Sequence, residues 1–217
     1  TLQDDGWVYR RNGDDRYRLS CHLHHIGDNL MAVDALIEAA GPVLDALQGD
    51  LLWPSDVAVR KGLNMEVVET TRKKQDLLVN RPILGDTLDI LRSAPGQAYF
   101  AFCTDTERAE ILERLALQES EVACLARNEN WVVSMLETVR QQGYGRREAR
   151  EGADVVGDLA GIAVPVLVDG RVKACINVVW PEGALAQERV EALVLPRLQQ
   201  AATELSDGVR QAFFADE

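Results

Sequence analysis

The chain has 217 residues, of which 47% are hydrophobic, so it is long enough for one large globular domain or one and a half. Its net charge of −12 opposes nucleic-acid binding by the body of the chain, because a DNA-binding face must neutralise phosphates. We expect no signal peptide, and the sequence contains no apolar run long enough to cross a membrane. Its four widely spaced cysteines lack CxxC pairing, which favours a cytoplasmic protein with reduced thiols and no membrane partner.

Residues 6–20 are a basic exception and are predicted to form a β-hairpin. Trp-Val-Tyr at 7–9 suits one strand, Asn-Gly-Asp at 12–14 suits a turn, and residues 17–19 suit the return strand. Arginines flank the turn on both sides: Arg10, Arg11, Arg16 and Arg18. The wing of a winged helix-turn-helix has this pattern and contacts DNA phosphates. On this interpretation residues 1–20 are the remnant of a DNA-binding domain, and Arg10, Arg11 and Arg16 contact DNA. An ordinary solvated hairpin with charged edges is the alternative.

The next segments alternate between helical and strand patterns. Apolar residues recur at helical spacing from Met31 to Gln48, with an expected break at Gly41-Pro42. Residues 51–60 and 63–72 are predicted to form two strands that join at Lys61-Gly62. A basic loop and a possible short strand at 76–80 follow.

The second half of the chain predicts further helices around a second hairpin. A helical pattern over 96–115 breaks near Cys103, where Thr104 is a candidate cap with Glu107 three residues on, and another helix over 131–142 ends at Gly143. Asp169-Gly170 joins two apolar strands, residues 162–168 and 172–180, which should lie in the middle of a sheet. A long helix over 185–214, with a kink at Pro196, closes the chain. Hairpin-connected strands with grouped helices predict an α+β fold: an antiparallel sheet flanked by helices.

Catalytic and metal-binding motifs are weak in this sequence. His22, His24 and His25 are the only histidines, and three rings so closely spaced cannot all face one ion, so we predict an exposed polar segment and no metal site. The sequence has no Gly-x-Ser-x-Gly motif and no phosphate-binding loop. We therefore predict that the protein is not an enzyme and has no cofactor, although carboxylate chemistry stays open.

Two features favour a small-molecule site. The connection from Gly143 to Gly161 is long and rich in charge and glycine, and such loops in compact domains are commonly functional. Asn177 places an amide in the apolar run Ala-Cys-Ile-Asn-Val-Val, where a buried amide needs a partner. Alternatively, Asn177 lies on a solvated face or bonds to the backbone.

Several segments, in this order, resemble the IclR family of bacterial transcriptional regulators. They are Arg16–Ser20 (RYRLS), Ala94–Ala101 (APGQAYFA), Val139–Tyr144 (VRQQGY) and Gly161–Val166 (GIAVPV) with the hairpin and final helix behind it. The resemblance implies a winged helix-turn-helix, a linker helix over residues 21–30 and a GAF-like effector-binding domain over 31–217. It also implies operator DNA and a small organic acid as partners, and a homodimer or homotetramer.

The family's ligand pocket, transferred by motif position, gives a set of candidate effector-binding residues. They are Leu88, Ala94, Pro95, Leu159, Gly161, Asn177 and Val179, with Arg146 or Arg147 as a further polar contact. Gln97 departs from the family, which usually has lysine there, and the loop after Tyr144 is longer than usual, so its register over 146–158 stays open.

These observations together predict a ligand-responsive regulator that binds an organic acid with an apolar body, for which an aromatic acid is a candidate. Arg147 or Arg146 is expected to pair with the carboxylate and Asn177 to bond a hydroxyl or carboxylate oxygen. Two alternatives stay open: a GAF-like dimerisation or protein-interaction module without a ligand, and an enzyme that uses a carboxylate such as Asp154 or Asp158.

Overall fold

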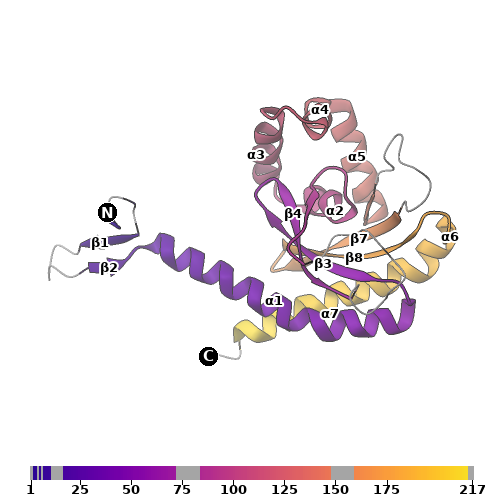
Figure 1. Cartoon of the computed structure of the whole chain (residues 1–217), viewed down its shortest axis with the longest axis horizontal. Helices are drawn as coiled ribbons and strands as arrows, with labels where there is room; N and C mark the ends of the chain where they lie inside the picture. The colour runs from indigo at the N-terminus through magenta and orange to yellow at the C-terminus, as the bar shows by residue number, and fades with distance from the viewer. Residues whose placement is uncertain are drawn as a thin grey trace.

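The computed structural model describes residues 2–3, 5, 7–10, 17–71, 84–147 and 159–214. Strands β1 (Val8–Arg10) and β2 (Tyr17–Leu19) pair antiparallel, which confirms the N-terminal hairpin. Figure 1 shows this hairpin at the far end of a long helix, away from the sheet and the other helices. The turn, with Arg11 and Arg16, lies outside the described residues, as does the side chain of Arg10. Their contact with DNA stays a prediction.

Helix α1 (Cys21–Leu51) is continuous, so the break expected at Gly41-Pro42 is wrong. Pro42 is exposed, whereas the residues that α1 directs inward are almost fully buried: Leu36, Ala40, Leu44 and Leu47. Burial of this stripe on both sides of Pro42 outweighs the local cost of proline inside a helix. The helix also passes without interruption through residues 30 and 31, where we expected a linker to give way to a domain.

Six antiparallel strands form the sheet, in the order β5-β4-β3-β8-β7-β6. Their bounds are β3 Ser55–Lys61, β4 Asn64–Thr70, β5 Thr87–Asp89, β6 Gly145–Arg146, β7 Leu159–Val168 and β8 Arg171–Pro181. The predicted β7–β8 hairpin is confirmed, and its turn residues Asp169 and Gly170 have φ of 52° and 73°. The antiparallel sheet with flanking helices confirms the α+β class. The possible strand at 76–80 lies outside the described residues.

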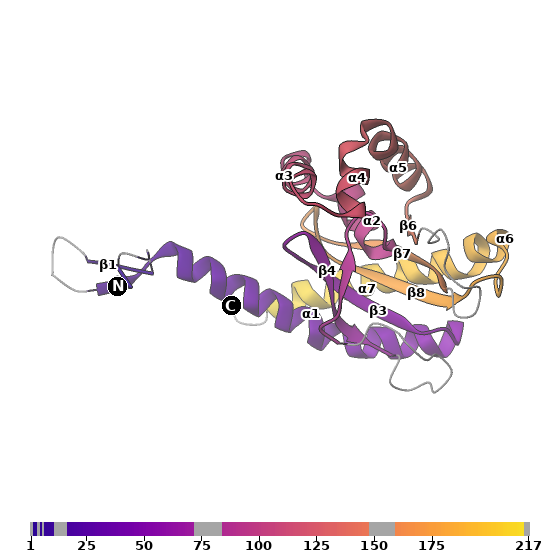
Figure 2. The ribbon, with the colours of Figure 1, turned by 45° about the horizontal axis from the view of Figure 1, so that its top comes forward.

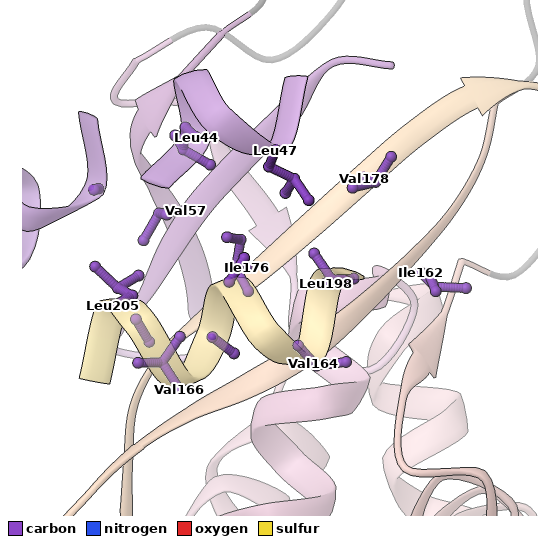
Figure 3. Packing of buried hydrophobic residues seen from close by; sticks show 14 of the residues in the cluster. Leu44, Leu47, Val57, Ile162, Val164, Val166, Ile176, Val178, Leu198 and Leu205 are labelled. Carbon is purple, nitrogen blue, oxygen red and sulfur yellow. The ribbon is translucent and has the colours of Figure 1, made fainter. Parts of the chain in front are cut away.

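One face of the sheet packs against α1 and the C-terminal helix α7 (Leu195–Phe214), as Figures 1 and 2 show. Figure 3 shows leucines of the two helices pointing toward valine and isoleucine side chains of the strands: Leu44, Leu47, Leu198 and Leu205 against Val57, Val164, Val166, Ile176 and Val178. The helices also touch each other closely, since a Cβ added to Gly208 would lie 3.0 Å from the Cβ of Ala39. We call this side the α7 face.

The other face, which we call the α2 face, is covered by α2 (Ala94–Phe102). Helices α3 (Asp105–Ala116), α4 (Glu121–Arg127) and α5 (Glu129–Gln142) pack around it. The Thr104 cap is confirmed, because its Oγ1 accepts from Glu107 N at 3.3 Å. The Glu107 carboxylate instead accepts from Tyr99 Oη at 2.5 Å and pairs with Arg60 at 2.7 Å, which ties α3 to α2 and β3. Gly143 ends α5 with a φ of 81°, as predicted.

Before α7, the chain winds through α6 (Gln187–Arg189) and the π-helical segment η2 (Val190–Val194). Leu195 N donates to Val190 O, five residues back, directly before Pro196. The disturbance expected at this proline therefore takes the form of a wider turn, which accommodates a ring that has no N–H to donate.

Candidate ligand-binding site

The hairpin β7–β8 places Asn177 and Val179 on the α2 face. Asn177 lies opposite Ala163, and Val179 lies opposite Gly161. Ala163 belongs to the core on the α2 side, and strand alternation carries the same orientation to Leu159, Gly161 and Val179. Asn177 is only 3% exposed, so it does not lie on a solvated face.

Leu88 and the first turn of α2 lie on the same side of the sheet. Leu88 pairs with Met65 across β5 and β4 and packs against the core of the α2 face. Ala94 and Pro95 are buried in that first turn, which starts at the cap Ser93. The positions that the resemblance selected on β5, α2, β7 and β8 thus converge on one face, and their role in binding stays a prediction.

The two candidate arginines, Arg146 and Arg147, lie on opposite sides of the sheet. Arg146 lies opposite Ile162, whose side chain belongs to the α7 face, and its Nη1 donates to Gln187 Oε1 at 2.8 Å. The structure therefore does not bring Arg146 together with Asn177. Arg147 N donates to Gly161 O at 3.3 Å, and alternation after Gly145 directs its exposed side chain to the α2 side. Residues 148–158, including Asp154 and Asp158, lie outside the described part of the chain.

Gln97, which stands where the family usually has lysine, connects strand β6 to the chain before α2. It is 4% exposed; its Nε2 donates to Leu91 O at 3.2 Å, and its Oε1 accepts from Arg146 N at 3.2 Å. Both ends of the amide are used by backbone groups. Gln97 thus has a structural role in this chain.

Asp56 is the residue of this region that sequence reasoning missed. It lies opposite Asn177 in the β3–β8 pairing and is 1% exposed. Its Oδ2 accepts from Asn177 Nδ2 at 3.0 Å, and its Oδ1 accepts from Thr70 Oγ1 at 2.7 Å. Among the described residues, the hydrogen-bond partner of Asn177 is therefore a side chain and not a backbone group. We call these three residues the Asp56 cluster.

The sequence pattern around Asp56 fits both a solvated and a buried position. In the sequence it alternates with Val57 and Val59, as a polar residue on a solvated sheet face does. That face is instead covered by α2, which no local pattern around Asp56 reveals. Within the described residues, Asn177 Oδ1 is buried without a hydrogen-bond partner.

Comparison with known proteins decides the family. Residues 30–207 match the family model described as "Bacterial transcriptional regulator IclR C-terminal". The chain belongs to the IclR family. Its six-stranded antiparallel sheet with flanking helices is the GAF-like effector-binding domain of these transcriptional regulators, which are not enzymes.

Solved IclR-type structures share the fold at low sequence identity. A transcriptional regulator from Rhodococcus sp. RHA1 is 20% identical, with a TM-score of 0.68 over 97% of this chain and 83% of that chain. The IclR protein of Thermotoga maritima is 18% identical, with a TM-score of 0.66 over 96% and 81%. The inducer-binding domain of an Acinetobacter PobR double mutant, in complex with 3-hydroxybenzoic acid, is 20% identical, with a TM-score of 0.63 over 78% and 96%.

A surface groove of about 430 Å³ lies at the β7 edge of the sheet, near the carboxyl ends of α2 and α5. It runs between β7 and α7 and is lined by Phe102, Gly143, Val164, Pro165, Leu167, Gln199, Ala202, Thr203, Ser206 and Arg210. None of the predicted effector-binding residues lines it. Pro165 has no N–H, and Leu167 O already accepts from Ser206 Oγ at 2.5 Å, so this edge of β7 is poorly suited to pairing with another strand.

The described residues of this IclR-family chain hold no group of three or more His, Cys, Asp or Glu side chains able to bind a metal. The three histidine side chains lie outside the description. Among the described helices, none is both long and apolar enough to span a membrane.

The cysteines differ sharply in environment, which predicts a simple labelling result. Burial raises the pKa of Cys103 to about 11 and raises that of Cys175 further, whereas Cys124 is exposed. With Ellman's reagent at pH 8, Cys124→Ser should remove one fast-reacting thiol, because only a thiolate attacks and a raised pKa keeps a thiol protonated. Cys103→Ser should leave the fast phase intact, because burial keeps the Cys103 thiol protonated at pH 8. Loss of the fast phase in Cys103→Ser would contradict this assignment.

Proposed function

We propose that this IclR-family domain binds a small organic acid on the α2 face of its sheet and thereby modulates operator binding. The observation that carries the proposal is the convergence of β5, the start of α2, β7 and β8 on one face at the positions selected from the sequence. The complex of the PobR domain with 3-hydroxybenzoic acid supports an aromatic acid as one candidate class.

Arg147 is the candidate partner of the ligand carboxylate, because strand alternation directs it to the α2 side, whereas Arg146 lies opposite Ile162 of the α7 face. Arg147 is exposed, so its contact with the carboxylate contributes roughly 1.5–3 kcal/mol only where the bound ligand shields the pair from water. Leu88, Leu159 and Val179 supply apolar surface for the body of the ligand.

Ligand binding acts on DNA only if it favours one of two arrangements of the protein. Helix α1 is the physical connection, since it packs on α7 at one end and leads to the β1–β2 hairpin at the other (Figure 1). A purely structural dimerisation module, the alternative reading, requires an interior in which Asn177 is fully bonded within the protein. Its unpartnered Oδ1 among the described residues favours the ligand-binding function.

A thermal-shift screen of aromatic and aliphatic carboxylic acids tests the proposal. An acid that binds should raise the melting temperature in proportion to RT ln(1 + [L]/Kd), where [L] is the free ligand concentration. Arg147→Ala should weaken the best acid about tenfold or more, equivalent to about 1.4 kcal/mol.

Arg146→Ala is the matched control, because it removes an arginine one residue away on the opposite face and should leave the affinity unchanged. Absence of a shift with every acid, or an equal loss in the two variants, would count against the proposed function.

A further inference from the structure

We infer that the effector presents a hydrogen-bond donor, a hydroxyl or an amino group, to Asn177 Oδ1, and that Asp56 creates this preference. The inference rests on the proposed function and narrows the ligand class from organic acids to hydroxy- or amino-substituted acids. It also revises the expectation that Asn177 bonds a carboxylate oxygen of the ligand.

Asp56 decides which end of the Asn177 amide is presented. Both carboxylate oxygens of Asp56 act as acceptors, one from Thr70 Oγ1 and one from Asn177 Nδ2. A turned amide would bring Oδ1 against a carboxylate oxygen, which is repulsive because neither atom carries a proton. Asp56 therefore holds the nitrogen of the amide toward itself and leaves the carbonyl oxygen on the far side.

The residues beside Asn177 on the sheet supply no strong hydrogen-bond donor to its Oδ1. Its Oδ1 is buried and has no partner among the described residues. On the same face, Ala163 lies opposite it, and Val179 and Cys175 flank it two residues away along β8. Alanine and valine side chains carry no donor, and a thiol is only a weak one. A buried carbonyl without a donor is unfavourable, so a ligand that supplies one removes an existing penalty and gains a hydrogen bond.

The same geometry excludes groups that only accept hydrogen bonds from the end of the ligand that faces Asn177 Oδ1. An ether, a ketone or a carboxylate oxygen would place lone pairs against Asn177 Oδ1, close to the buried carboxylate of Asp56. The acid group of the effector therefore lies at its other end, away from the Asp56 cluster. A site that hydrogen-bonds a ligand donor discriminates strongly against analogues that lack it, since the protein group is then left unpaired.

Isothermal titration calorimetry with matched probes tests the inference. The probes are benzoates and hexanoates that carry, at a position remote from the carboxylate, a hydroxyl, an amino, a fluoro or a methoxy group. Fluorine matches a hydroxyl in size without donating, and methoxy keeps an acceptor oxygen. We expect the hydroxyl or amino member of the binding series to bind at least tenfold more tightly than its fluoro and methoxy partners.

Asp56→Asn then tests the positioning role, because an amide at residue 56 accepts either orientation of Asn177. The ratio of hydroxyl to fluoro affinity should fall at least tenfold in this variant, and Asn177→Leu should abolish the preference. Asp34→Asn, the same substitution at an exposed site on α1, should keep it. Circular dichroism verifies that each variant is folded, and the affinity ratio is a readout that a merely structural role for Asp56 leaves unchanged.

The outcomes separate the two claims. Equal or tighter binding of the fluoro or methoxy probes overturns the donor requirement and leaves the proposed function standing. An unchanged ratio in Asp56→Asn overturns the role of Asp56. Absence of binding by every probe, together with a failed acid screen, overturns the proposed function and the inference with it.

Discussion

Gly145→Ala is expected to destabilise the protein by about 3 kcal/mol, the upper end of the usual cost of overpacking. A Cβ at this position would lie 2.3 Å from Ala94 O and 2.6 Å from Ala98 N. Both neighbours are backbone atoms of α2, so no side chain can rotate away. Strand β6 would have to separate from α2, where Gln97 joins them and where the candidate site begins.

Urea denaturation followed by circular dichroism measures this effect. Gly41→Ala is the matched control, because nothing lies within 4 Å of the Cβ it would add inside α1. Alanine is the better helix former, so this control should raise the free energy of unfolding by about 0.5–1 kcal/mol. Equal stability of Gly145→Ala and the wild-type protein would mean that β6 does not pack on α2 as described.

Arg108→Met is expected to cost about 3 kcal/mol, because it removes the donors that satisfy the carboxyl end of α2. Arg108 is 8% exposed and donates to Phe100 O at 2.9 Å, Ala101 O at 3.2 Å and Cys103 O at 2.6 Å. Methionine keeps the apolar stem but leaves these carbonyls short of partners. Two of the carbonyls keep a second donor: Ala101 O accepts from Arg140 Nε at 3.0 Å, and Phe100 O accepts from the weak donor Cys103 Sγ at 3.3 Å.

The same helix α3 provides the comparison. Arg114 is half exposed and, within the described part of the chain, pairs only with Glu110, four residues earlier, at 3.3 Å. Arg114→Met should change the free energy of unfolding by no more than about 0.5 kcal/mol. If Arg108→Met costs as little in thermal or urea unfolding, the buried guanidinium does not hold α2 and α3 together.

Sequence patterns predicted the elements that local chemistry determines. Thr104 caps α3 and Gly143 ends α5 because each interaction involves residues only three or four positions apart. Asp169-Gly170 likewise makes its own turn. These signals need no knowledge of the rest of the chain, and the structure confirms them.

The errors and omissions depended on distant partners. Proline at 42 breaks an isolated helix, but the buried stripe of α1 packs against elements far along the chain and keeps it whole. The role of Asp56 depends on its hydrogen bond with Asn177, which lies 121 residues away in the sequence. The faces of Arg146 and Arg147 depend on the register of a two-residue strand, which no periodicity could resolve.

The close approach of Ala39 on α1 to Gly208 on α7 is a point about which the long helix α1 is able to tilt. From Val33, the first residue of α1 whose side chain is described, the helix continues to Cys21 over about 18 Å, at about 1.5 Å per residue. If α1 tilted by about 5° about its contact with Gly208, Cys21 would move by roughly 1.6 Å relative to Val33. Because Gly208 lacks a side chain, α1 and α7 approach each other closely at this point, and any small change in the angle between them displaces the hairpin end of α1 more than the packed end.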